Sequence, residues 1–208
     1  MLLELTFINF ALWFDIHFRL LLMEVISAIG LSFIVLSFMM RLKSRTIGII
    51  GLVIILLHNL LQYVTIPQNP VLIAVSAILF RPSMLPVTPR LSLYTAYPLV
   101  PWLGIMLAGF ACGEFFEIPA EKRNKFFIRI GIVLLALFAV IRFINIYGDP
   151  APWTHQKSAL FTFLSYINVT KYPPSLQFTL LFTGIAFAAL YLSEKAGTRI
   201  TGILSKSI

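Results

Sequence analysis

The sequence predicts an all-α membrane protein, a bundle of about five full transmembrane helices preceded by a partial N-terminal one. Hydrophobic residues make up 59% of the 208 residues, and charged residues make up only 12%. A soluble domain of this length could not bury so much apolar surface and would expose aggregation-prone patches. Several apolar runs also reach the roughly 20 residues that a helix needs to cross a hydrocarbon core about 30 Å thick.

The predicted spans follow one another along the chain. An apolar N-terminal segment ends near Phe14, and we expect the chain to begin part-way into a span. The full spans are predicted at residues 20–40, 46–64, 97–116, 126–147 and 173–193. Each is apolar nearly all round rather than along one stripe, which is typical of lipid-embedded helices. Because nothing indicates a separate soluble domain, we expect residues 1–208 to form a single transmembrane domain.

Two longer connections separate these spans, at residues 65–96 and 148–172. The first contains an apolar decamer, residues 71–80, between Pro70 and Pro82. As a helix it would extend about 15 Å, which is too short to cross a bilayer. We therefore expect this decamer to be an interfacial or re-entrant piece.

The distribution of Lys and Arg predicts the orientation in the membrane. Ten of these residues lie in the 41–45 turn, the 117–129 loop and the C-terminal tail, and six lie on the opposite side. The side richer in basic residues is expected in the cytoplasm, so both longer connections lie outside. The net charge of +8 then reflects membrane topology, and we predict no nucleic-acid partner.

The residue types exclude several kinds of site. Cys112 is the only cysteine, so the chain has no intrachain disulfide and no cysteine-based metal site. The sequence contains no phosphate loop, dinucleotide fingerprint, Gly-x-Ser-x-Gly nucleophile or zinc-binding His/Glu spacing. We therefore predict no bound metal.

Small residues lie at helical spacing in the third full span. Gly109-x-x-x-Gly113 follows Gly104-x-x-x-Ala108. This spacing lets another helix approach closely. We expect packing within the bundle, and the alternative is a homo-oligomer formed through Gly109 and Gly113.

Polar side chains inside the apolar runs form the candidate site. Alternating helix directions bring most of them to one membrane face, the outer one, with Glu114 as the main exception. Ionisable groups within spans are costly and usually face the bundle interior or a wet cavity. We expect a hydrophilic cavity that binds an anionic or hydroxyl-rich ligand. The residues concerned are Glu24, His58, Asn59, Gln62, Tyr97, Trp102, Arg142, Asn145, Lys171 and Gln177.

Individual members of this set have alternative roles. His58 could act as a general base oriented by Glu24, because imidazole titrates near neutrality. Alternatively, His58 and Asn59 could hydrogen-bond carbonyls freed at a helix end. Arg142 could reach the headgroups or form an ion pair with Glu24. The Trp and Tyr side chains could form an interfacial belt.

Residues 168–175 are the most informative stretch. Their sequence, NVTKYPPS, places an amide, a cation, a phenol and a Pro pair directly before an apolar run. A lysine at the mouth of a span is either a surface anchor or part of a binding site. Its setting favours the binding site, so we predict that Asn168, Lys171 and Tyr172 contact a ligand.

Six ordered segments resemble one bacterial membrane-protein family, the one related to heparan-α-glucosaminide N-acetyltransferase. They are residues 2–5 (LLEL), 25–30 (VISAIG), 58–61 (HNLL), 97–104 (YPLVPWLG), 147–150 (YGDP) and 168–175 (NVTKYPPS). The resemblance implies a many-span helical protein of the bacterial inner membrane. It also implies transfer of an acyl group, typically acetyl, from acyl-CoA to a sugar or glycan.

The chain departs from the family at both ends. Family members begin with an Arg-Gly motif and a span with an Asp-His pair, where the catalytic histidine lies, and they continue with further spans. We therefore expect a fragment that lacks the catalytic residue and is inactive alone; His58 is not that histidine. A transporter or channel module is the alternative from another class, since embedded Glu, Arg and His also mark permeation routes. A truncated, non-catalytic membrane protein is the third alternative.

Overall fold

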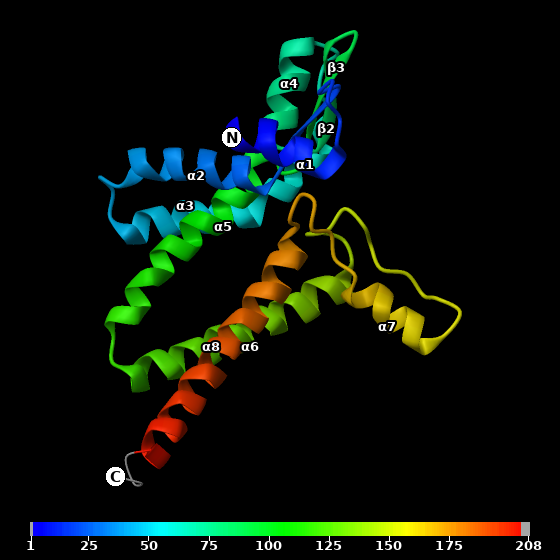
Figure 1. Ribbon diagram of the computed structural model, residues 1–208. Helices are drawn as coiled ribbons and strands as arrows, with labels where there is room; N and C mark the ends of the chain where they lie inside the picture. Colours follow the sequence, from blue (N-terminus) through cyan, green and yellow to red (C-terminus); the bar gives the residue numbers. More distant parts are fainter. Residues whose placement is uncertain (1, 205–208) are drawn as a thin grey trace. The chain divides into compact units, whose positions relative to one another are not determined.

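The computed structural model describes residues 2–204, which are mostly helical (Figure 1). This confirms the predicted helical membrane fold. The helical elements are η1 (Glu4–Ile8), α1 (Asn9–Trp13), α2 (Val25–Met39), α3 (Ser44–Leu57), η2 (His58–Tyr63), α4 (Pro70–Leu79), α5 (Leu99–Cys112), η3 (Gly113–Glu117), α6 (Ala120–Ile144), α7 (Ala159–Ile167) and α8 (Leu176–Leu204). The strands are β1 (Leu20–Met23), β2 (Ser83–Thr88) and β3 (Leu91–Thr95).

Within the described residues, 4 helical segments are long and apolar enough to cross a membrane. They are Ser44–Tyr63, Leu99–Glu117, Ala120–Ile144 and Leu176–Gly197. Each coincides with a span predicted from hydropathy. The first predicted span is shorter than expected, because α2 has only 15 residues and extends about 22 Å.

The start of that predicted span, residues 20–23, is strand rather than helix. Strand β1 pairs in parallel with β3, with Leu20 opposite Ser92. Strand β2 pairs antiparallel with β3, which gives the order β1-β3-β2. Leucine is compatible with both helix and strand, and the distant pairing with β3 decides the outcome. The sheet ends directly before Tyr97, where the amide of Ala96 donates to the carbonyl of Met23 at 3.0 Å.

The described chain divides into two compact units. The first comprises the chain up to Ala111 together with Thr170–Ser175, and the second comprises Cys112–Val169 and the chain from Leu176 onward. The six residues Thr170–Ser175 thus belong to the first unit, although the residues on both sides of them in the sequence belong to the second. The single-domain organisation of residues 1–208 stays a prediction.

In the first unit, helices α2, α3 and α5 form a core around Leu36, Ile47, Leu103 and Leu107. Helices α3 and α5 approach closely at Gly51. A Cβ atom added there would lie 2.6 Å from the amide nitrogen of Ala108. The small residue is therefore required by the contact between the two backbones.

The buried carboxylate of Glu4 fixes the beginning of α2. It accepts hydrogen bonds from the amides of Ile26 at 3.1 Å and Ser27 at 2.8 Å, and also from the Ser27 hydroxyl. These amides belong to the first turn of the helix and have no partner within it. The negative charge also complements the helix dipole.

In the second unit, helices α6 and α8 pack against each other (Figure 1). Gly131 and Gly184 face each other at this contact, where a Cβ on either would lie 3.2–3.3 Å from the other's carbonyl oxygen. Gly109 and Gly113 differ from these glycines, since a Cβ there would meet no described atom within 4 Å.

Candidate functional site

The turn Thr170–Ser175 is held to the end of α3 by His58. The Nε2 atom of His58 lies 2.8 Å from the carbonyl oxygen of Pro174. The amide of Ser175 donates to the carbonyl of Thr170 at 3.0 Å and closes the turn. Because Ser175 is fully buried, this end of the turn forms part of the interior of the first unit.

The other nitrogen of His58 also faces carbonyl groups. Nδ1 lies 3.1 Å from the oxygen of Ile54 and 3.0 Å from that of Ile55, both in the last turn of α3. The ring therefore has no nitrogen turned toward a ligand. This geometry favours the alternative in which His58 satisfies carbonyls at a helix end over the general base. Asn59, the next residue, is also buried.

Lys171 and Tyr172 project from this turn into a cluster of aromatic side chains. The Nζ atom of Lys171 lies 5.0 Å from the centre of the Tyr172 ring. The Tyr97 hydroxyl donates to the Tyr172 hydroxyl oxygen at 3.1 Å. Tyr97 in turn stacks on Trp102, with 5.3 Å between ring centres. The structure thus brings together four of the residues that the sequence singled out.

The two phenols of this cluster differ in acidity. The hydrogen bond from Tyr97 and the neighbouring ammonium of Lys171 hold the pKa of Tyr172 below its usual range. Burial, together with the hydrogen bond to Tyr172, raises the pKa of Tyr97. Since the oxygen of Tyr172 accepts this hydrogen bond, its own O–H is available to donate to a ligand. Tyr172 is 48% exposed, so a ligand can reach it.

Glu24 and Trp102 contribute to the surroundings of these phenols. The negative charge of Glu24, which directly precedes α2, acts on both Tyr97 and Tyr172 and disfavours their ionisation. The indole Nε1 of Trp102 is buried and has no hydrogen-bond partner in the described part of the chain. An indole N–H can only donate, so it offers one more donor to an acceptor group.

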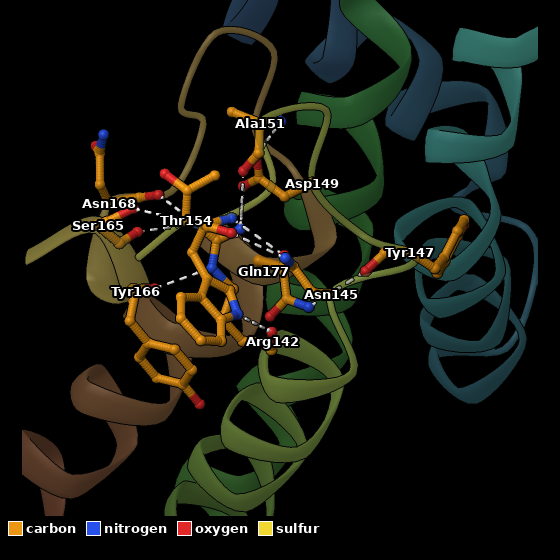
Figure 2. Close-up of polar contacts among 11 residues, drawn as sticks. Arg142, Asn145, Tyr147, Asp149, Ala151, Thr154, Ser165, Tyr166, Asn168 and Gln177 are labelled. Carbon is orange, nitrogen blue, oxygen red and sulfur yellow. Dashed lines mark hydrogen bonds and ion pairs between the residues drawn. The ribbon is translucent and has the colours of Figure 1, made fainter. Parts of the chain in front are cut away.

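Arg142 lies in the second unit, where it organises the connection between α6 and α8 (Figure 2). It is 2% exposed, so it does not reach the headgroups. Its guanidinium donates to four carbonyl oxygens and lies 3.9 Å from the carboxylate of Asp149. The carbonyls belong to Ala151 (3.0 Å), Ser165 (3.3 Å), Tyr166 (2.9 Å) and Asn168 (2.6 Å).

The acidic partner that the structure gives Arg142 is thus Asp149, a residue that the sequence reasoning did not select. Trp153 was also missed: its indole donates to the carbonyl of Arg142 at 2.8 Å, and its backbone exchanges hydrogen bonds with Asn145. The available signal was the rigid sequence Gly148–Trp153, which begins six residues after an arginine at the end of an apolar run. Asn168 joins this network through its backbone oxygen.

The described residues contain no group of three or more His, Cys, Asp or Glu side chains that could hold a metal ion. The polar groups that converge are instead an ammonium, two phenols and an indole N–H. Such donors bind carbonyl oxygens and anions rather than cations.

These features define an integral membrane protein with a cation-and-phenol site beside the first turn of a span. The family follows from the sequence: residues 3–142 match the family described as "Heparan-alpha-glucosaminide N-acetyltransferase, catalytic". The chain belongs to this family, as its motifs predicted. The matched residues include Glu24, His58, Tyr97 and Trp102, whereas Lys171 and Tyr172 follow them in the chain. Comparison with curated proteins and with solved structures gives no match.

Proposed function

We propose that this chain takes part in acyl transfer within a membrane, with acyl-CoA as the donor and an amine or hydroxyl of a sugar or glycan as the acceptor. Membership of an acetyltransferase family supports the type of reaction. The observation that carries the site is the convergence of Lys171, Tyr172 and Tyr97. These residues supply fixed donors at one point of the first unit.

The proposed chemistry uses those donors on the thioester carbonyl. When an acceptor nitrogen or oxygen attacks this carbon, the new C–N or C–O bond forms, negative charge collects on the carbonyl oxygen, and the C–S bond then breaks. The acceptor's proton leaves with a base or with the departing thiolate. A positioned ammonium and phenol stabilise the developing oxyanion, and removing one such donor typically lowers kcat by about 10²–10³.

The remaining candidates take supporting roles in this proposal. His58 positions the turn that carries Lys171 and Tyr172. The indole N–H of Trp102 donates a hydrogen bond to the acyl donor or to the acyl acceptor. The negative charge of Glu24 disfavours ionisation of the two phenols. Arg142 fixes the backbone of Asn168, three residues before Lys171. Asn59, which lies in the same unit as these donors, contacts the acceptor.

The test is acyl transfer by the complete protein, including any segments that flank this chain, from labelled acetyl-CoA to a panel of amino sugars. Lys171→Ala is expected to lower kcat by about 100-fold and Tyr172→Phe by a smaller factor, because each removes a donor. Lys157→Ala is the matched control, since Lys157 is an exposed lysine in the same connection. Unchanged transfer by Lys171→Ala would show that this site is not the reacting centre.

The same protein in proteoliposomes distinguishes the transporter alternative. Solute flux without acyl-CoA and without an acylated product would support a permeation route and contradict acyl transfer. We also propose that the membrane is the bacterial inner membrane. The open faces of Gly109 and Gly113 leave room for a helix of a second copy.

A further inference from the structure

Helix α7 (Ala159–Ile167) turns its polar side chains toward the protein. The Thr162 hydroxyl accepts a hydrogen bond from the amide of Gln156 at 2.9 Å, and the Ser165 hydroxyl accepts one from the amide of Thr154 at 3.0 Å. The Tyr166 hydroxyl donates to the carbonyl of Ala139 in α6 at 2.7 Å. The residues at this 3–4 spacing form the inner face of the helix.

The outer face of α7 is apolar. Leu160 is 64% exposed, Phe161 60%, Phe163 57% and Leu164 43%. A helix on the surface of a water-soluble protein has the opposite arrangement, with its apolar stripe inward. The surroundings of this outer face must therefore be apolar.

The hydrogen bonds of α7 place it level with the end of a membrane span. Ala139 lies five residues before Ile144, where α6 ends, which corresponds to about 7.5 Å along the helix axis. The last turn of α7 is tied to this depth by Tyr166 and by the bonds from Arg142 to the carbonyls of Ser165 and Tyr166 (Figure 2). Helix α7 is thus held beside the final turns of α6.

We propose that α7 is an interfacial helix whose outer face contacts phospholipid at the bilayer surface. A hollow of about 590 Å³ lies at the edge of this face, next to the residues that precede the helix, and it is lined by Gln156, Phe161, Leu164, Ser165, Ile167 and Asn168. Its apolar side chains suit an acyl chain, and its amide and hydroxyl groups suit the ester and headgroup region. This arrangement is typical of helices that lie in the membrane plane.

The test measures the depth of α7 with nitroxide labels on the protein in lipid nanodiscs. Single cysteines are introduced in a Cys112→Ser background at Phe161→Cys and Leu164→Cys. Ile132→Cys in the middle of α6 serves as the lipid reference, and Lys157→Cys serves as the water reference. The ratio of collisions with oxygen to collisions with a water-soluble nickel chelate reports depth, and circular dichroism confirms that each labelled protein is folded.

We expect the labels at 161 and 164 to give oxygen-to-nickel collision ratios several-fold above the ratio of Lys157→Cys. Their ratios should not exceed that of Ile132→Cys. Ratios equal to that of Lys157→Cys would mean that the face is in water and would overturn the proposal. Labels that collide with neither reagent would also overturn the proposal. Such a result would mean that protein covers the face, either another part of this chain or a second copy. The inference concerns membrane contact alone and does not depend on acyl transfer.

Discussion

His58 connects two segments that are 116 residues apart in the chain. Its contact with the carbonyl of Pro174 joins the end of α3 to the turn that carries Lys171. This contact stabilises the fold because the carbonyl is buried. A buried carbonyl that loses its hydrogen-bond donor still carries the free-energy cost of desolvation.

We therefore expect His58→Leu to lower the free energy of unfolding by about 1–3 kcal/mol, because Pro174 loses its partner. The amide of Ser175 should also exchange its hydrogen faster as the turn loosens. His17→Leu is the control, since His17 is exposed, and its effect should stay within about 0.5 kcal/mol. Thermal unfolding and hydrogen exchange in detergent provide the measurement. Equal losses in both variants would mean that the contact with Pro174 does not stabilise the fold.

The sequence identified the important polar residues better than it identified their roles. Lys171, Tyr172, Tyr97 and Trp102 were selected from their position near span ends, and the structure brings them together. The contact of His58 with carbonyls at the end of α3 was one of its two predicted roles, but its contact with Pro174 could not be predicted, because that partner is a distant backbone carbonyl. Every residue type has a backbone carbonyl, so no pattern of side chains in the sequence predicts which carbonyl will be the partner.

At the level of helices, the close approach of α3 and α5 depends on Gly51. We expect Gly51→Ala to destabilise the first unit by about 1–3 kcal/mol, because the new Cβ must displace the backbone of α5. Gly30→Ala in α2 is the matched control in the first unit, because a Cβ there meets no described atom within 4 Å. It should be neutral or stabilising by about 0.5–1 kcal/mol through helix propensity. Thermal unfolding of both variants tests this, and a Gly51→Ala protein as stable as the parent would contradict the contact.

Hydropathy predicted the four long spans well because a membrane helix needs only length and apolarity, both of which are local properties. It could not predict β1, since the leucines of residues 20–23 continue directly toward the apolar run of α2. Their strand conformation depends on pairing with β3, far along the chain. Helix α7 was missed for another reason: nine residues are too few for a span.

For the molecule as a whole, the charge distribution predicts which loops share a side of the membrane. Impermeant maleimide on intact cells should label Lys157→Cys and leave Lys43→Cys and Lys122→Cys unlabelled, all in a Cys112→Ser background. Inside-out vesicles should give the reverse pattern. If Lys122→Cys and Lys157→Cys were labelled from the same side, α6 would not cross the membrane, and the span assignment would be wrong.

The division into two units could not be predicted from hydropathy, because both units contain spans of similar composition. Hydropathy assigns residues to membrane or loop but does not say which spans pack together. The small residues partly supplied this information: Gly51 and Gly104 mark one helix pair, and Gly131 and Gly184 mark another. Gly109 and Gly113 have the same spacing without a described neighbour, so spacing alone did not identify the partner.

The passage of Thr170–Ser175 into the first unit also sets an order for biosynthesis. Ribosomes add about 5–20 residues per second, so the segment up to Ala111 enters the membrane seconds before Pro174 is made. During that interval His58 lacks its later partner, and the nascent first unit lacks both Lys171 and Tyr172. A chain released before Ser175 would therefore insert α3 and α5 into the membrane without ever acquiring the polar site.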